Sequence, residues 1–183
     1  MSRFRRVEGG LSVKLEEYES ALLESLAEQL VSLLSADEIG PAVSDPFAAW
    51  EAELGEEPLD TSDPVLARLF PSAYTDDADA EADFRRYTES TQRRTKIEQA
   101  GVVLAAIRAG REGRGRVLIP AAATQAWLQT VSALRLSLAV RLGIETADDA
   151  AELEALEEDD PRAFVHHVYE WLGYFVESLL AKL

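Results

Sequence analysis

From residue 102 to residue 120 the sequence reads VVLAAIRAGREGRGRVLIP. Residues 102–107 are apolar on every side of a helix, whereas a helix at the surface carries a single apolar stripe. We therefore expect a long helix over residues 79–109 that leaves the surface and enters the core near Gly101. Gly110 is the residue type that most often follows the end of a helix, and it is predicted to be the C-cap.

The second half of this stretch predicts a turn and a strand. Residues 111–116 are polar and rich in glycine, and residues 117–119 are all β-branched or leucine. Near the N-terminus, residues 4–7 and 11–15 flank a Gly-Gly pair, which is a pattern typical of a β-hairpin. Two strands alone are marginally stable, so the segment at 117–119 is a candidate third short strand.

The rest of the chain is predicted to be mostly helical. Tyr18, Leu22, Leu26 and Leu30 recur every four residues and predict an amphipathic helix that buries this stripe. We predict a mainly α fold, a single-domain helical bundle over residues 1–183 with four to five main helices and a small N-terminal β-hairpin. The segments are a hairpin at 1–15, helices at 16–35, 63–70, 79–109, 121–142, 148–157 and 160–183, and an acidic irregular loop at 36–62.

Capping residues mark the ends of several of these helices. Asp63 followed by Pro64 predicts a helix start, and Pro71 is expected to stop that helix. Asp160 is predicted to cap the last helix in the same way. Gly143 is expected to end the helix that precedes it.

Composition excludes several classes of protein. The 183 residues include no Cys, two His, and 34 acidic against 18 basic side chains, for a formal net charge of −16. Without Cys the chain has no disulfide scaffold and no Cys-ligated zinc or iron–sulfur site, and two His are too few for a multi-histidine metal centre. The negative charge disfavours direct nucleic-acid binding. No apolar run approaches the roughly 20 residues that span a bilayer, so we expect a cytoplasmic protein that binds no membrane.

The sequence contains no recognisable catalytic or cofactor motif. It has no Gly-x-Ser-x-Gly elbow, no Walker loop and no dinucleotide-binding glycine fingerprint. His166 and Glu170 are four residues apart and would share one face of a helix, but no third metal ligand has matching spacing. We therefore predict a non-enzymatic protein without a metal or a cofactor.

Charge is distributed unevenly along the chain. Residues 85–116 carry nine basic and three acidic side chains, a net +6, whereas residues 16–84 carry −18 and residues 145–183 carry −9. One interpretation is that the basic segment neutralises acidic parts of the fold, such as the loop at 36–63 or the last helix. The other is a docking surface for an acidic partner or for nucleic-acid phosphate, which Arg3, Arg5 and Arg6 would enlarge if the hairpin packs beside the turn. The candidate partner-binding residues are Arg85, Arg86, Arg93, Arg94, Arg111 and Arg114.

Arg135 lies within the apolar stripe of the helix predicted at 121–142. Its neighbours on that face include Val131 and Leu138. A buried guanidinium needs a carboxylate or carbonyl partners. The first interpretation is a structural ion pair with Asp63, Glu98 or a glutamate of the last helix, and the second is an anion-binding role.

Three segments together resemble one known family. They read DPVLARLFP at residues 63–71, FRRYTESTQRRTK at 84–96 and WLQTVSALRLSLAVRLGI at 127–144. With the Gly-Gly pair near the start, they are similar to an actinobacterial family of AosR-like oxidative-stress regulators, formerly a domain of unknown function. The structural motif residues that carry the resemblance are Asp63, Pro64, Arg68, Pro71, Trp127, Arg135 and Arg141.

The resemblance implies a cytosolic regulator that responds to oxidants and acts on transcription through a protein partner such as a sigma factor. This chain departs from the family because it has no Cys for a disulfide, and it has Ser132-Ala133 where an Asn-Asp pair is expected. We therefore expect a non-enzymatic cytoplasmic regulatory or adaptor protein that acts through protein–protein contacts, without a cysteine redox switch. The alternative is a small-molecule or anion-binding helical domain with a pocket around Arg135. Leu136 and Val140, or the last helix, are candidate contacts for a homodimer.

Overall fold

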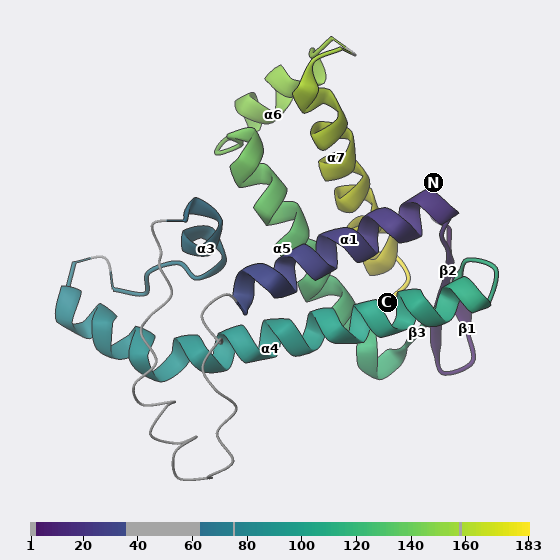
Figure 1. Ribbon diagram of the computed structural model, residues 1–183, viewed down its shortest axis with the longest axis horizontal. Coiled ribbons are helices and arrows are strands. Elements are labelled where there is room, and N and C mark those ends of the chain that lie inside the picture. The colour runs from purple at the N-terminus through teal and green to yellow at the C-terminus, as the bar shows by residue number, and fades with distance from the viewer. Residues whose placement is uncertain (1–2, 36–62, 75, 158) are drawn as a thin grey trace.

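The computed structural model describes residues 3–35, 63–74, 76–157 and 159–183. Within these residues the chain forms three strands, a short 3₁₀ turn and six α-helices, of which four are long (Figure 1). The predicted mainly α fold with an N-terminal hairpin is confirmed, whereas the acidic loop predicted at 36–62 lies outside the described residues. The elements are β1 (Arg3–Val7), β2 (Gly10–Lys14), α1 (Glu17–Leu34), α3 (Pro64–Leu69), α4 (Ala78–Glu112), β3 (Arg116–Pro120), η1 (Ala121–Ala123), α5 (Thr124–Leu142), α6 (Ala147–Glu154) and α7 (Pro161–Leu180).

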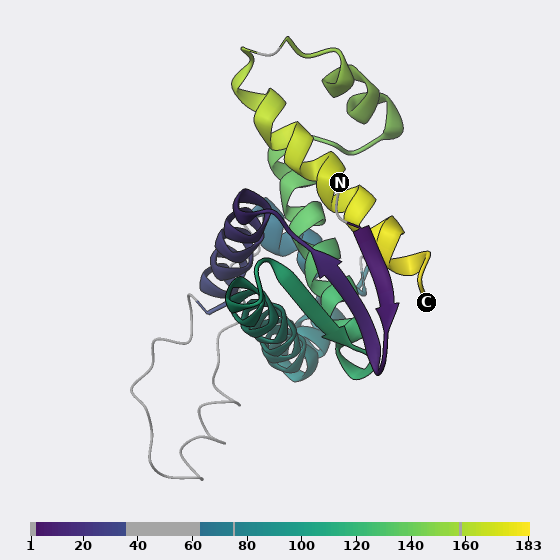
Figure 2. The ribbon, with the colours of Figure 1, turned by 90° about the vertical axis from the view of Figure 1, so that its right-hand side faces the viewer.

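The three strands form one antiparallel sheet in the order β1-β2-β3, so the candidate third strand is confirmed. Phe4 on β1, Val13 on β2 and Val117 on β3 lie opposite one another and are buried. The ring of Phe4 meets the ring of Phe175 edge-on, with 4.9 Å between the centroids. The sheet therefore packs one face on α7, and α4 adjoins its β3 side (Figure 2).

Gly110 does not end α4, contrary to the prediction. The helix continues to Glu112, and Gly113 is its C-cap. A Cβ at position 110 would lie 2.7 Å from Val117 Cγ2, closer than real side chains approach. The glycine therefore allows β3 to pack tightly against the helix, a tertiary reason that a local capping pattern does not reveal.

α4 lies along the core rather than inside it. Val103, Leu104 and Ile107 are buried, but Val102 is 42% exposed. The expected entry of the helix into the core near Gly101 is therefore wrong, because a single buried face accounts for the apolar segment. α1 lies beside α4 along this part of its length (Figure 1).

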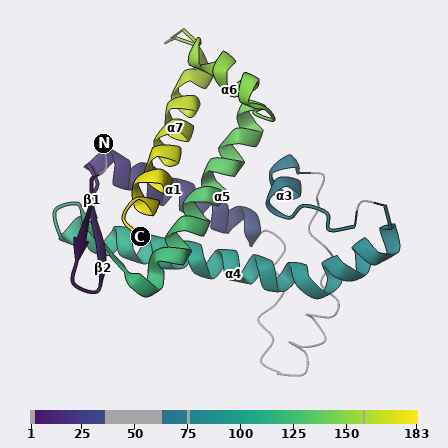
Figure 3. The same cartoon turned by 180° about the vertical axis from the view of Figure 1, so that it is seen from behind.

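α5 is the central helix, because it contacts α1, α3, α4 and α7. Trp127, Val131, Leu134 and Leu138 are buried, among them Val131 and Leu138 of the predicted apolar stripe. The Trp127 indole stacks on the ring of Phe175, with 5.8 Å between the centroids. Figure 3 shows α5 and α7 running side by side away from α4, with α6 at their far end.

The buried face of α1 is rotated from the predicted stripe. Tyr18 is 69% exposed, whereas Leu23, Ala27 and Leu34 are buried together with Leu30. Apolar residues occupy neighbouring positions around this helix, so packing against α4 selects which of them face inward.

The predicted helix ends are confirmed at three places. Asp63 Oδ1 accepts a hydrogen bond from the backbone N–H of Val65 at 2.7 Å, and Asp160 Oδ1 accepts one from that of Arg162 at 2.8 Å. Each aspartate is followed by a proline in the first turn. Gly143 follows α5 in the left-handed conformation, with a φ of +73°.

Candidate partner-binding surface

Two arginines in the first half of α4, Arg85 and Arg93, are held by carboxylates of the same helix. Arg85 Nε lies 2.7 Å from Glu81 Oε1, and its Nη1 lies 3.9 Å from Glu89 Oε2. Arg93 is 4% exposed, and its Nη2 lies 3.4 Å from Glu89 Oε1. These pairs are four residues apart, a spacing that brings side chains together on a helix. The hydrogen bond from Arg85, followed by that from the Tyr74 backbone, lowers the pKa of Glu81 to about 2.

The arginines near the end of α4 are paired with α1. Arg108 Nε donates to Glu24 Oε1 at 2.8 Å, and its Nη2 donates to Glu28 Oε1 at 2.7 Å. Arg111 Nη2 lies 2.6 Å from Glu24 Oε2. The hydrogen bonds to Glu24 and Glu28 raise the pKa of Arg108. For these residues the neutralising interpretation is supported, although the acidic element is α1, which the sequence did not suggest.

Two further α4 residues were predicted to bind a partner. Arg94 is exposed on the helix. For Arg86 the structure describes the helical backbone and not the side chain. Their binding role stays a prediction. Arg93, by contrast, is too deeply buried to meet a partner, so we assign it to the internal pairing of α4.

A different set of cations lies on the outer face of the sheet. In the strand register Lys14 lies directly opposite Arg116, and Arg5 shares the next row of the sheet with Leu118. All four residues are exposed, and Leu118 is 58% exposed. We call Arg5, Lys14, Arg116 and Leu118 the basic sheet face. Figure 2 shows the strands that carry it, flanked by α7 and α4.

The basic sheet face has few counterions. Within the described part of the chain, no carboxylate lies within 4 Å of the charged groups of Arg5 or Arg116. Lys14 Nζ lies 3.7 Å from Glu16 Oε1, and both of these side chains are largely exposed. Exposed pairs of this kind are weak because water screens them.

Sequence reasoning missed Lys14, Arg116 and Leu118 as members of one surface. The alternation within β3 indicates which residues point outward, but only the strand register shows that they are neighbours. Arg6, expected to enlarge a basic surface, belongs to the other face, where its Nη2 donates to the Leu183 main-chain oxygen at 3.4 Å.

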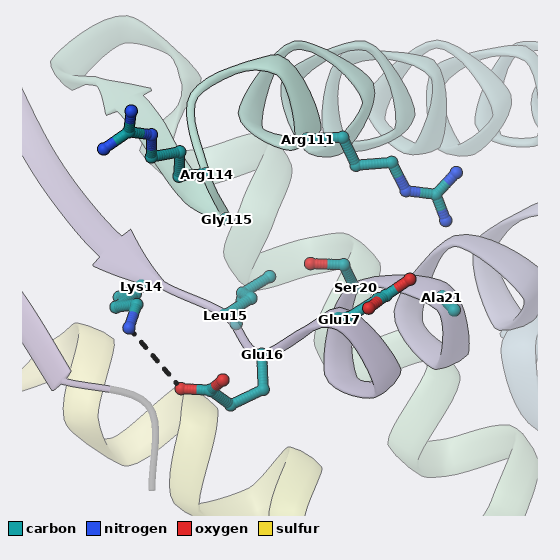
Figure 4. A pocket seen from close by; sticks show the side chains of 9 residues that line it. All are labelled: Lys14, Leu15, Glu16, Glu17, Ser20, Ala21, Arg111, Arg114 and Gly115. Carbon is teal, nitrogen blue, oxygen red and sulfur yellow. Dashed lines mark ion pairs between the residues drawn. The ribbon is translucent and has the colours of Figure 1, made fainter.

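A pocket of about 600 Å³ adjoins this face where β2, α1 and the turn after α4 meet (Figure 4). Lys14, Arg111 and Arg114 line it from three different elements, together with Glu16 and Glu17. The lining therefore carries three cations and two carboxylates. The pocket shares Lys14 with the basic sheet face, but its own charges nearly balance, so we do not treat it as a separate basic site.

The turn that carries Arg114 is held against the end of β2. The Leu15 N–H donates to the Gly115 carbonyl at 2.9 Å, so the hairpin does pack beside this turn. Arg114 has a φ of +57°, the left-handed region that glycine favours. This conformation costs a residue with a Cβ about 1 kcal/mol or more. The turn thus keeps a cation at a position that glycine would suit better.

The model of one protein family, described as Domain of unknown function (DUF2017), matches residues 1–183. The chain belongs to the DUF2017 family. Among curated proteins and among solved structures, nothing matches this chain.

The motif residues of this DUF2017 chain do not gather at one site. Asp63 caps α3, and Arg68 and Pro71 are exposed at the other end of that helix. Trp127 is fully buried in the core, and Arg141 is exposed near the end of α5. Asp63 and Trp127 therefore occupy positions that support the fold, whereas Arg68, Pro71 and Arg141 lie at the surface.

Arg135 forms no ion pair with the described residues of this DUF2017 chain. Its Nη2 donates to the Tyr169 hydroxyl at 3.0 Å, and its guanidinium lies over the Tyr169 ring, 4.3 Å from the centroid. The predicted ion pair with Asp63, Glu98 or a glutamate of the last helix is therefore wrong. α7 instead offers an aromatic face and a hydroxyl, which stabilise a half-buried cation without neutralising it.

The described residues contain neither a metal-binding cluster nor a helix that could span a membrane. Across residues 3–35, 63–74, 76–157 and 159–183, no group of three or more His, Cys, Asp or Glu side chains is arranged to hold a metal ion. No helix in that part of the chain is long and apolar enough to cross a membrane. His166 is buried, and its ring lies 6.3 Å from that of His167.

Proposed function

We propose that this DUF2017 protein is a non-enzymatic regulatory or adaptor protein that binds an acidic segment of a partner protein on the basic sheet face. The resemblance to AosR-like regulators favours a partner in the transcription machinery. Because the chain has no Cys, its regulation would not use a disulfide.

The observation that carries the proposal is the placement of like charges side by side with only one weak, exposed counterion, Glu16. Lys14 and Arg116 face each other on neighbouring strands, and like charges directly opposite destabilise a sheet. A carboxylate-rich segment laid across the strands would relieve this repulsion. Leu118 lies beside these charges and would supply apolar contact, a combination typical of protein interfaces.

Protection of sheet edges explains only part of this pattern. Charged side chains on edge strands prevent one sheet from pairing with another, which accounts for Arg5 on β1 and Arg116 on β3. Lys14 lies on β2, the central strand, where no edge needs protection. Edge protection therefore does not account for the complete row of charges.

Affinity capture from an extract of the cells that make the protein tests this proposal, with mass spectrometry identifying the captured partner. Three baits are compared: the unchanged chain, the Arg5→Glu/Arg116→Glu variant, and a matched Arg68→Glu/Arg141→Glu variant. The control makes the same change in charge at exposed arginines outside the basic sheet face. We expect the unchanged chain and the control to capture one acidic partner that the sheet variant loses.

Two outcomes would contradict the proposal. One is equal capture by all three baits when circular dichroism shows each to be folded. The other is loss of the partner after nuclease treatment of the extract, which would indicate that nucleic acid bridges the contact. With the purified partner, the affinity should fall as salt concentration rises, because screening weakens exposed charge pairs.

A further inference from the structure

The groove between α5 and α7 contains Arg135, a cation that forms no ion pair with the described residues. The groove is open, has a volume of about 190 Å³, and is lined by Arg135 together with Leu136, Ala139 and Val176. We propose that it binds a small organic carboxylate with an apolar tail, and that Arg135 holds the carboxylate. The groove shares no residue with the basic sheet face, so this inference does not rest on the proposed function.

The first argument is the state of the Arg135 guanidinium. An arginine stays protonated in proteins, and here its partners are the neutral ring and hydroxyl of Tyr169. Nε is buried without a hydrogen bond, whereas Nη1 has no hydrogen bond among the described residues and is not buried. A planar guanidinium with free N–H groups matches the geometry of a carboxylate.

The second argument is that α7 is shaped around this guanidinium. Gly173 lies within the helix, where glycine is less favourable than alanine. A Cβ at this position would lie 3.0 Å from Arg135 Nε and 3.1 Å from its Cζ. Tyr169 is one helical turn earlier on the same face. Together they leave a slot in which the guanidinium lies over the tyrosine ring.

The third argument is the character of the remaining walls. Leu136, Ala139 and Val176 are apolar, and Ser132 adds a hydroxyl to the lining. A cavity of about 150 Å³ lined by apolar side chains is known to accept benzene, so this groove has room for one aromatic ring or a short alkyl chain. The tail of the ligand is therefore expected to be apolar and small.

One acidic residue in the lining opposes an anion. Glu177 lines the groove from α7, but its carboxylate is not within 4 Å of the Arg135 guanidinium. Its charge would repel a bound carboxylate through Coulomb interaction. Removal of this charge should strengthen binding, whereas a merely structural role for Arg135 predicts no effect on a ligand.

Titration of the full-length protein with benzoate and with hexanoate tests the inference, with backbone amide chemical shifts in NMR spectra as the measurement. Benzamide and hexanamide are the uncharged probes of matched size. We expect the two carboxylates to shift the backbone amide signals of groove residues. Benzamide and hexanamide should bind at least about tenfold more weakly, because charge-assisted hydrogen bonds are lost. Arg135→Met should reduce carboxylate affinity about tenfold, while Arg141→Met, on the same helix outside the groove, should not.

Glu177→Gln keeps the test decisive if Arg135→Met does not fold. This variant should bind benzoate more tightly than the unchanged protein does. The inference is overturned if neither carboxylate shifts the groove residues at millimolar concentration, if the amides bind equally well, or if Glu177→Gln weakens binding. The Arg135→Met variant should still capture the protein partner. This result separates ligand binding in the groove from partner binding on the basic sheet face.

Discussion

The arginines of α4 and the cations of the basic sheet face come from one continuous basic segment and the hairpin, yet their surroundings differ. Arg85 and Arg93 meet glutamates one helical turn away, and Arg108 meets two glutamates of α1. Arg5 and Arg116 have no such partner among the described carboxylates. The net charge of a segment therefore does not locate a charged surface, because pairing removes most of it.

Helix and strand geometry explain this difference. In a helix, residues four apart are neighbours, so alternating acidic and basic residues neutralise each other locally. In a sheet, every second residue points to the same face, and the neighbours come from other strands. Lys14 and Arg116 are far apart in sequence but adjacent in the sheet, and the only described carboxylate within 4 Å of either charge is that of the exposed Glu16 beside Lys14.

The largest effect that separates the two regions is expected at Arg93. Arg93→Met removes a buried ion-pair partner of the Glu89 carboxylate, and breaking a buried pair costs about 3 kcal/mol. Arg116→Met on the sheet should change the free energy of unfolding by less than about 0.5 kcal/mol. Urea denaturation measures both. The double variant Glu89→Gln/Arg93→Met should recover part of the lost free energy of unfolding. Equal losses for Arg93→Met and Arg116→Met would contradict the difference between the two regions.

A smaller effect of opposite sign is expected at Arg114. Arg114→Gly removes a Cβ from a left-handed backbone position and should stabilise the protein by about 1 kcal/mol. Arg114→Ala is the matched control, because it removes the charge and keeps the Cβ, and it should give no such gain. Thermal unfolding measured for both variants distinguishes them. A gain for alanine as large as that for glycine would show that charge, rather than backbone strain, is responsible.

The smallest expected effect is on stability: neutralising cations of the basic sheet face and neutralising an arginine of α4 should change the free energy of unfolding in opposite directions. Lys14→Gln/Arg116→Gln should stabilise the protein by about 0.5 kcal/mol at low salt, because it removes cross-strand repulsion. Arg108→Gln should destabilise it by about the same amount, because it removes exposed pairs with α1. Both effects should shrink in 1 M sodium chloride, and their persistence there would argue against an electrostatic origin.

Much of the fold could be predicted from local patterns. The hairpin, the third strand and the aspartate caps follow from residue types at fixed spacing, and the structure has them where they are expected. Gly110 was misassigned because its role depends on Val117 approaching from the sheet. Tyr18 was misassigned because several stripes of α1 are apolar and only the neighbouring helix selects one.

The candidate site was less predictable, because its members come from separate segments. The pairing of Arg108 with Glu24 joins residues 84 positions apart, and no spacing rule connects them. The stacking of Arg135 on Tyr169 likewise depends on how α7 packs against α5. The apolar neighbours of Arg135 in the sequence predict a buried guanidinium paired with a carboxylate. In the structure its partner is instead the ring and hydroxyl of Tyr169.

The length of α4 limits what a single partner can reach. Its 35 residues correspond to a rod of about 50 Å, whereas a small domain is about 30 Å across. The basic sheet face lies by the C-terminal end of this rod, and the linked residues Glu81 and Arg85 lie near its other end. A domain-sized partner seated on the sheet would leave the far end free, so substitutions at the two ends should have additive effects on binding and on stability.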